Sequence, residues 1–193
     1  MVLPFPTMLS RKLFRKLPKP SGCSSEANNM QNIILCGFMG CGKTTVGKIL
    51  SRMLSWEYLD LDEMIEDEAG KPIPVIFSED GEQAFRDLEH EVVSSLAKRI
   101  RCVVSAGGGT MVYERNRKAL SPLDTVVFLD ADFESCYSRI KNSNRPLVCK
   151  HTKEELETLF NQRYNSYLEA AQMTVDARFQ PQTAAEEIAG RLP

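Results

Sequence analysis

The sequence has little of what a membrane protein, a disulfide-bonded secreted domain or a zinc protein needs. No apolar run approaches the ~20 residues that a helix needs to cross a bilayer, so no membrane-spanning helix is predicted and no membrane is expected as a partner of the folded domain. The six cysteines form no C-x-x-C pair, so neither a zinc site nor a disulfide is predicted, and a reducing cytoplasm is expected. No motif surrounds His90, His151 or Trp56, and we expect a structural or surface role for each.

An excess of basic charge is also missing. The 193 residues carry 24 Lys or Arg and 26 Asp or Glu, for a formal net charge of −2. Residues 1–29 hold five basic residues and one acidic residue, net +4, which leaves 19 basic and 25 acidic residues, net −6, for the rest. An acidic body without a basic stripe argues against nucleic acid as the main partner. A hydrophobic fraction of 42% is ordinary for one globular domain.

Residues 1–30 differ in composition from all that follows. They contain four prolines and then a tract rich in Ser, Gly and Asn, and 10–17 could form two basic amphipathic turns. Three interpretations stay open: an organellar transit peptide, a membrane-touching arm, or an extension upstream of a translation start at Met30. We predict a disordered basic extension over 1–30 and one folded domain over 31–193.

The folded part alternates between strand and helix patterns. We predict short strands at 33–36, 58–59, 102–105, 125–129 and 174–175. We predict helices at 43–55, 62–69, 82–98, 114–120, 133–141, 154–171 and 184–191. Gly70, Pro72 and Pro74 are expected to break the chain before the long third helix, and 143–153 is expected to be polar and irregular. This alternation predicts a parallel sheet with helices on both faces.

Residues 37–44 read Gly-Phe-Met-Gly-Cys-Gly-Lys-Thr, a complete G-x-x-x-x-G-K-[ST] phosphate-binding loop between a predicted strand and a predicted helix. Its three glycines allow backbone N–H groups to point into one concavity, and the start of the helix adds its positive dipole end. Lys43 is expected to reach the β- and γ-phosphates, and the Thr44 hydroxyl to ligate Mg²⁺. The loop therefore predicts binding of a nucleoside triphosphate.

Other polar residues follow the later strands, where open α/β sheets bind ligands. Asp60 and Asp62 lie two apart and can share a face, so one could hold a Mg²⁺ water shell while the other accepts a proton from a hydroxyl. The alternative is that Asp62 only caps the helix after it. The glycines at 107–109 would admit a ligand closely, or form a flexible turn.

Three arginines could hold a substrate carboxylate through a planar fork: Arg86, Arg145 and Arg163. Taken singly, an arginine of this kind is more often a solvated surface residue than a ligand-binding one. Nothing in the composition or the spacing brings them together.

The motifs together resemble the shikimate kinase family, from the strand at Ile33 to the closing helix. The resemblance rests on six ordered segments, 37–48, 59–62, 76–86, 106–109, 145–147 and 163–164. It implies a P-loop NTPase-type three-layer α/β/α sandwich with a five-stranded parallel sheet and a mobile lid. The loop sequence also differs from the GxPGxGKGT form of adenylate kinases.

The resemblance implies a role for each matching residue. Asp62 would contact shikimate and act as the base, and Asp60 would be linked to Mg²⁺ through water. Arg86 and Arg163 would clamp the shikimate carboxylate, and the shikimate pocket would be lined by Gly107, Gly108 and Gly109.

The nucleotide site is implied in the same way. Arg145 would close over the phosphates as the lid arginine, Arg139 would stack near adenine, and the loop 176–181 would flank it. The remaining ATP contacts are expected from Gly40, Cys41, Gly42, Lys43, Thr44 and Thr45.

The activity implied is transfer of the γ-phosphate of ATP to the 3-hydroxyl of shikimate, with Mg²⁺ as cofactor. The expected protein is a cytoplasmic monomer with ATP and shikimate as its partners, or an organellar one if 1–29 is a transit peptide. Two alternatives are a P-loop kinase of another hydroxy acid such as gluconate, and a non-catalytic relative. A non-catalytic relative should have lost Lys43, Asp62 or a clamp arginine, and this sequence has them all.

Overall fold

The fold is built on one parallel sheet. The computed structural model describes residues 32–143 and 145–192, so the extension predicted over 1–30 lies outside the described residues. Five strands form the sheet in the order β2-β3-β1-β4-β5, and each neighbouring pair is parallel. Their bounds are β1 Asn32–Cys36, β2 Glu57–Asp60, β3 Cys102–Ser105, β4 Thr125–Asp130 and β5 Met173–Asp176. The predicted five-stranded parallel sheet is confirmed.

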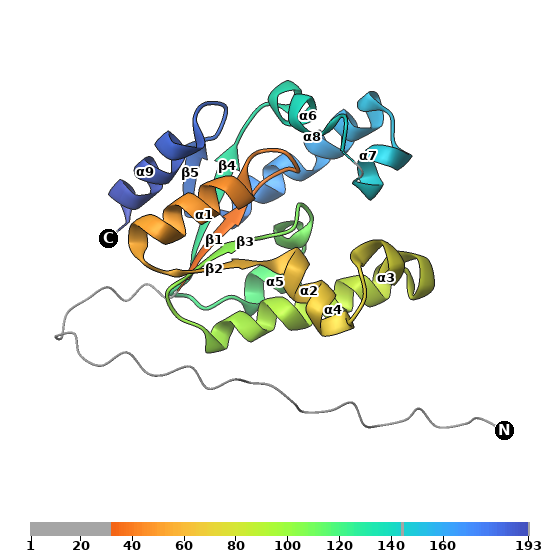
Figure 1. Cartoon of the computed structure of the whole chain (residues 1–193), viewed down its shortest axis with the longest axis horizontal. Helices are drawn as coiled ribbons and strands as arrows, with labels where there is room; N and C mark the ends of the chain where they lie inside the picture. Colours follow the sequence, from red (N-terminus) through yellow and green to blue (C-terminus); the bar gives the residue numbers. More distant parts are fainter. Residues whose placement is uncertain (1–31, 144, 193) are drawn as a thin grey trace.

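Helices cover both faces of this sheet (Figure 1). On one face of the sheet, α1 packs against α9 and β3. On the other face, α8 packs against β4, and α4 packs against α5. The α-helices are α1 Lys43–Leu54, α2 Leu61–Ala69, α3 Ile73–Glu79, α4 Gly81–Ser95, α5 Glu114–Ala119, α6 Phe133–Ile140, α7 Pro146–Lys150, α8 Lys153–Ala170 and α9 Pro181–Arg191. Two 3₁₀ turns, η1 Leu96–Lys98 and η2 Thr110–Val112, follow α4 and β3. None of the helices described is long and apolar enough to cross a membrane.

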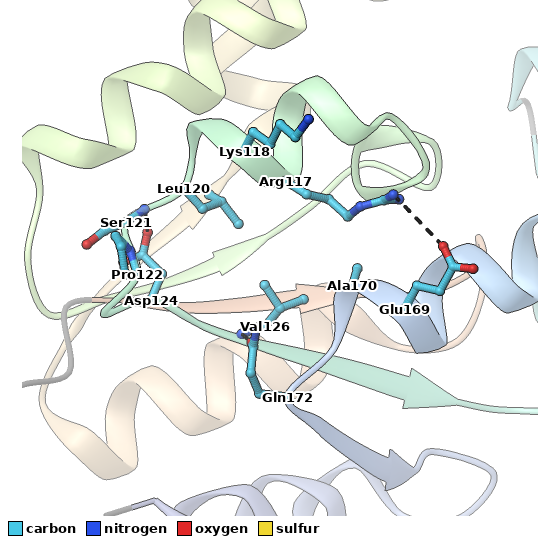
Figure 2. Close-up of a pocket in the computed structure, with 10 residues that line it drawn as sticks. All are labelled: Arg117, Lys118, Leu120, Ser121, Pro122, Asp124, Val126, Glu169, Ala170 and Gln172. Carbon is cyan, nitrogen blue, oxygen red and sulfur yellow. Dashed lines mark hydrogen bonds and ion pairs between the residues drawn. The ribbon is translucent and has the colours of Figure 1, made fainter.

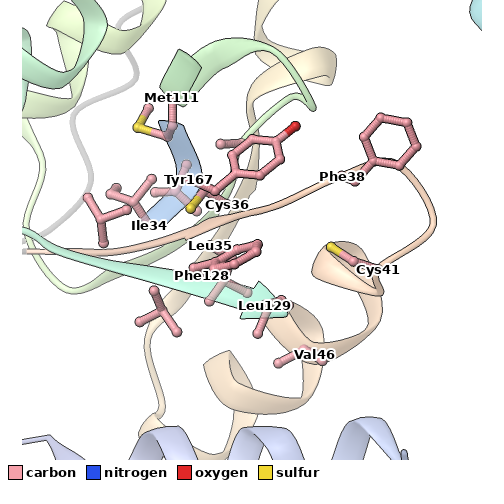
Figure 3. Close-up of a cluster of buried hydrophobic side chains, with 14 of the residues drawn as sticks. Ile34, Leu35, Cys36, Phe38, Cys41, Val46, Met111, Phe128, Leu129 and Tyr167 are labelled. Carbon is pink, nitrogen blue, oxygen red and sulfur yellow. The ribbon is translucent and has the colours of Figure 1, made fainter. Parts of the chain in front are cut away.

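The central strands explain why the sheet holds together. Every residue of β1 and β3 is buried, whereas the edge strands β2 and β5 each have an exposed residue. Aromatic rings from distant segments pack around β1. The ring of Phe128 in β4 is tilted by 30° relative to that of Tyr167 in α8, with the ring centroids 5.5 Å apart (Figure 3). Four of the five described cysteines are also buried, and all five are free thiols.

The predicted break of the chain at Gly70, Pro72 and Pro74 is present, but a further helix that was not predicted, α3, begins there. Gly70 does end α2, with a left-handed φ of 66°. The two prolines flank the start of α3. The first backbone N–H groups of a helix have no partner within the helix, so Pro74, which lacks this group, costs α3 no hydrogen bond. Phe77 then packs on Phe85 of α4, with ring centroids 4.6 Å apart.

The segment 143–153 is also not wholly irregular. Residues 146–150 form the short helix α7, which again has a proline in its first turn. A capping box follows, in which Thr152 and Glu155 satisfy each other's backbone N–H groups and start α8. These local hydrogen bonds, rather than apolar periodicity, order the segment.

Candidate active site

The phosphate-binding loop joins β1 to α1 and needs its glycines for two reasons. Gly37, Gly40 and Gly42 have φ values of 137°, 83° and 107°, which residues with a Cβ rarely adopt. A Cβ on Gly40 would also lie 2.5 Å from the backbone oxygen of Cys136 in α6. The loop is therefore fixed by both its conformation and its neighbours.

Lys43 folds back over this loop from the first position of α1. Its Nζ donates hydrogen bonds to the backbone oxygens of Gly37 at 2.9 Å and Phe38 at 3.0 Å. Two carbonyls thus hold the ammonium beside the N–H groups of the loop, where it can meet a phosphate. Thr44 and Thr45 follow at the exposed start of the helix.

Asp60, at the end of β2, connects three elements. Its Oδ2 accepts hydrogen bonds from Thr44 Oγ1 at 3.4 Å and from the Tyr58 hydroxyl at 3.1 Å. Its Oδ1 accepts the backbone N–H of Asp62 at 3.1 Å, so Asp60 is the N-cap of α2. The alternative that Asp62 is only a helix cap is therefore wrong, because the preceding acid performs that function.

Asp62, in the first turn of α2, is an unusual carboxylate. Burial raises its pKa above the ordinary value, and the negative charge of Asp60 raises it further, against the opposing charge of Lys43. Its Oδ1 lies against the glycine loop after β3, since a Cβ on Gly107 would be only 2.8 Å from it. A carboxylate with a raised pKa is a better proton acceptor.

The two other glycines of this loop each contact one arginine. Arg163 of α8 donates from Nη1 to the Gly108 oxygen at 3.3 Å. A Cβ on Gly109 would lie 3.1 Å from Nη1 of Arg86 in α4. The fold thus brings Asp62, Arg163 and Arg86 to three consecutive glycines, although 101 positions separate Asp62 from Arg163 (163 minus 62).

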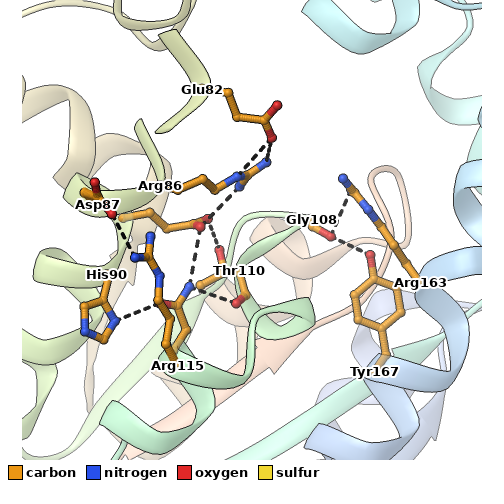
Figure 4. A network of polar contacts seen from close by, with 11 residues as sticks. Glu82, Arg86, Asp87, His90, Gly108, Thr110, Arg115, Arg163 and Tyr167 are labelled. Atoms are coloured by element: carbon orange, nitrogen blue, oxygen red, sulfur yellow. Dashed lines mark hydrogen bonds and ion pairs between the residues drawn. The ribbon is translucent and has the colours of Figure 1, made fainter. Parts of the chain in front are cut away.

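A buried network holds Arg86 from behind (Figure 4). Glu89, only 1% exposed, accepts from Arg86 Nη1 at 3.2 Å and from Thr110 Oγ1 at 2.8 Å. Asn116 donates to Glu89 at 3.4 Å and hydrogen-bonds His90 at 3.0 Å, so His90 has the structural role expected of it. Buried charges are stable only when paired in this way.

Sequence reasoning missed Glu89, Thr110 and Asn116. The one available signal was the spacing of Arg86 and Glu89, three apart on a predicted helix, which places the two side chains on one face. Thr110 and Asn116 reach the network only through the tertiary fold.

Arg139 and Arg145 lie on the nucleotide side. Arg139 donates to the oxygen of Gly40 at 3.1 Å and to that of Arg178 at 3.1 Å, joining the phosphate-binding loop to the loop after β5. Arg145 is exposed at the start of α7, and its positive charge acts on Asp62 to lower the pKa of that carboxyl. Both residues are thus placed around the phosphate-binding loop and Asp62.

A family model of shikimate kinase matches residues 39–193 of the chain. The chain belongs to the shikimate kinase family. The shikimate kinase of Persephonella marina is 37% identical over 163 residues, which cover 84% of this chain and 99% of that protein. That of Geobacter sulfurreducens is 44% identical over 142 residues, covering 72% and 78%.

Solved structures agree with this assignment. Shikimate kinase from Acinetobacter baumannii in complex with shikimate superposes with a TM-score of 0.77 at 35% identity, over 83% of this chain and 91% of that one. Deoxyadenosine kinase from M. mycoides, at 16% identity and a TM-score of 0.53, shares the fold alone. The resemblance to shikimate kinases, the P-loop kinase fold and the kinase class of enzyme are confirmed.

The oxygen donors of the site fit a hard divalent cation. Thr44 Oγ1 and Asp60 Oδ2 lie 3.4 Å apart at the start of α1. Within 32–143 and 145–192, no group of three or more His, Cys, Asp or Glu could hold a metal. Mg²⁺ at a nucleotide is held by one or two protein oxygens together with phosphates and water, and Thr44 and Asp60 are oxygen donors of this kind.

A separate hollow lies at the opposite end of the sheet (Figure 2). It has a volume of about 390 Å³ and lies at the amino ends of β4 and β5, near Asp124, Val126 and Gln172. Arg117 on its wall is already bonded to the backbone oxygens of Met111 and Val112 and approaches Glu169. None of the predicted site residues of the family lines it.

Proposed function

We propose that this protein transfers the γ-phosphate of ATP to the 3-hydroxyl of shikimate, giving shikimate 3-phosphate and ADP in aromatic amino acid biosynthesis. The observation that carries the proposal is the convergence of Asp62, Arg86 and Arg163 on the glycines 107–109. Membership of the shikimate kinase family supports both the reaction and the acceptor.

ATP would bind with its phosphates on the loop 37–44. The phosphates would be held by backbone N–H groups of the loop, by one ammonium and by the exposed start of α1. These contacts would come from Gly40, Cys41, Gly42, Lys43, Thr44 and Thr45. The bonds of Arg139 to the loop after β5 support the proposal that this arginine and 176–181 flank the adenine.

Thr44 and Asp60 would hold Mg²⁺, Thr44 through its hydroxyl and Asp60 through water. When bound, the ion would neutralise charge on the β- and γ-phosphates. Asp60 can serve this role while capping α2, because each function uses a different carboxylate oxygen.

Shikimate would bind through its carboxylate, held by Arg86 and Arg163. Because both arginines lie against the glycine loop that also contacts Asp62, the ring of the acid would extend from the clamp toward Asp62. Asp62 would then accept the proton of the 3-hydroxyl as that oxygen attacks the γ-phosphorus in line. Lys43 and Arg145 would stabilise the charge that develops on the transferring phosphoryl group.

The proposed site needs only one chain. The same chain supplies all the residues that would act on the substrates: Lys43, Asp62, Arg86, Arg145 and Arg163. This supports the proposal that the enzyme works as a monomer, with ATP and shikimate as its small-molecule partners. The cytoplasmic location stays a prediction.

A substrate panel tests the proposal. ADP release would be measured with shikimate, with gluconate and with no acceptor, in the presence of ATP and Mg²⁺. We expect rapid release only with shikimate. Preference for gluconate would favour a kinase of another hydroxy acid, and no release with any acceptor would favour a non-catalytic relative.

A further inference from the structure

Tyr113 is an exposed aromatic residue whose position is explained neither by the core nor by capping. It follows η2 four residues after Gly109 and is 37% exposed. It occupies the N-cap position of α5 without making a side-chain cap hydrogen bond, where Ser, Thr, Asp or Asn would be preferred. Its contact is elsewhere: the guanidinium carbon of Arg86 lies over the Tyr113 ring, 4.8 Å from the centroid.

The other partners of Arg86 constrain it in a different way. Glu89 receives Nη1 at 3.2 Å, and Glu82 receives Nε and Nη2 at 3.3 and 3.2 Å. These hydrogen bonds fix where the guanidinium lies and use three of its five N–H donors, which leaves one on Nη1 and one on Nη2. The ring of Tyr113, like that of Phe85 at 5.0 Å, contacts the guanidinium without using any donor.

The free direction of Arg86 is toward the glycine loop. A Cβ on Gly109 would lie 3.1 Å from Nη1 and 3.5 Å from Nη2, so this edge of the guanidinium faces the glycine. A carboxylate binds such an edge through two parallel hydrogen bonds only when the two groups are nearly coplanar. The tilt of the guanidinium plane therefore decides how well a carboxylate is held.

We propose that Tyr113 is a positioning residue for the substrate carboxylate, because its ring sets the plane of the Arg86 guanidinium. The inference rests on the proposed function, in which Arg86 binds that carboxylate. The segment from Gly107 to Tyr113 then has two roles in substrate binding. Its glycines leave space for the acid, and its tyrosine orients the arginine that binds the carboxylate.

Steady-state kinetics of three variants tests the inference. Tyr113→Ala and Tyr113→Leu should raise KM for shikimate about three- to tenfold, the range of a partly exposed cation–π contact. Their kcat and their KM for ATP should change by less than about twofold, since the contact is made equally in the ground and transition states. Tyr113→Phe keeps the ring and should match the wild type, and thermal melts would show that all three fold.

Two further measurements separate orientation of the arginine from general packing. With the carboxamide of shikimate, which is neutral, Tyr113→Ala should make no difference to KM. In an Arg86→Ala background, Tyr113→Ala should raise KM for shikimate no further, because the effect acts through Arg86.

The outcomes distinguish the inference from the function on which it rests. If Arg86→Ala raises KM for shikimate but Tyr113→Ala does not, or if Tyr113→Leu behaves like the wild type, the inference is overturned and the clamp stands. If Arg86→Ala leaves KM unchanged, the clamp itself is wrong.

Discussion

At the scale of single residues, Asp62 is the carboxylate that we propose as the base. Asp62→Asn keeps the shape but cannot accept the hydroxyl proton, so kcat should fall by about 10²–10⁴, with KM for ATP nearly unchanged. Steady-state rates of ADP release would measure this. A variant that kept more than half the wild-type rate would remove Asp62 from the role of base.

The raised pKa of Asp62 predicts a gain in stability from the same substitution. The folded state binds the Asp62 proton more tightly than the unfolded state, so ionised Asp62 lowers the free energy of unfolding above its folded pKa. Asp62→Asn should therefore unfold at a higher temperature than the wild type near neutral pH. The difference should shrink as pH falls from the raised folded pKa to the ordinary pKa of the unfolded chain, and should stay constant below that.

Thermal melts of both proteins from neutral to acidic pH would test this sign. A variant with lower Tm at every pH would show that the attraction of the Asp62 carboxylate to Lys43 and Arg145 outweighs its desolvation. Activity should have the opposite dependence, because proton acceptance requires the ionised form: kcat/KM for shikimate should fall as pH drops through the pKa of Asp62.

The arginines should separate into two kinetic classes. Arg145→Ala removes the charge that we propose acts on the transferring phosphoryl group, so kcat should fall by orders of magnitude with a smaller effect on KM for shikimate. Arg86→Ala and Arg163→Ala should chiefly raise KM for shikimate. If Arg145→Ala changed only that KM, Arg145 would belong to the carboxylate clamp.

At the scale of elements, the phosphate-binding loop depends on its contact with α6. In Gly40→Ala the new methyl meets the Cys136 oxygen at 2.5 Å, at a φ of 83°, so strain of about 1–3 kcal/mol and a displaced loop are expected. Gly190→Ala is the matched control, because this glycine lies in α9 with nothing within 4 Å of its Cβ position.

Urea unfolding would compare the two glycine variants. Gly190→Ala should be stabilised by about 0.5–1 kcal/mol through helix propensity, while Gly40→Ala is destabilised and its KM for ATP rises. If the two variants had the same free energy of unfolding, the loop would accommodate the added methyl group without strain.

At the scale of the whole molecule, the residues described from Asn32 onward already form a continuous core. Buried residues run from β1 to Ile188 of α9 and form one cluster. A chain that starts at Met30 should therefore match the full chain in kcat and Tm. A loss of several degrees would indicate that the extension packs on the domain, and import of the full chain into isolated organelles would favour a transit peptide.

Much of this protein could be predicted from its sequence because the relevant interactions are local. The phosphate-binding loop is eight consecutive residues whose glycines and helix start act on one another, and the alternating pattern of strands and helices determines a parallel sheet. The helices α3 and α7 were missed because prolines that break one helix can also begin the next, and only packing such as Phe77 on Phe85 decides between these outcomes.

The tertiary structure alone decided how the acceptor side is assembled. The carboxyl ends of β2 and β3 lie side by side in the sheet, and this places Asp62 against Gly107. Helices α4 and α8 then bring Arg86 and Arg163 to the other two glycines, and the segment between η2 and α5 brings Tyr113 to Arg86. These contacts join residues far apart in the chain, so their geometry follows from how layers pack and no sequence spacing encodes it.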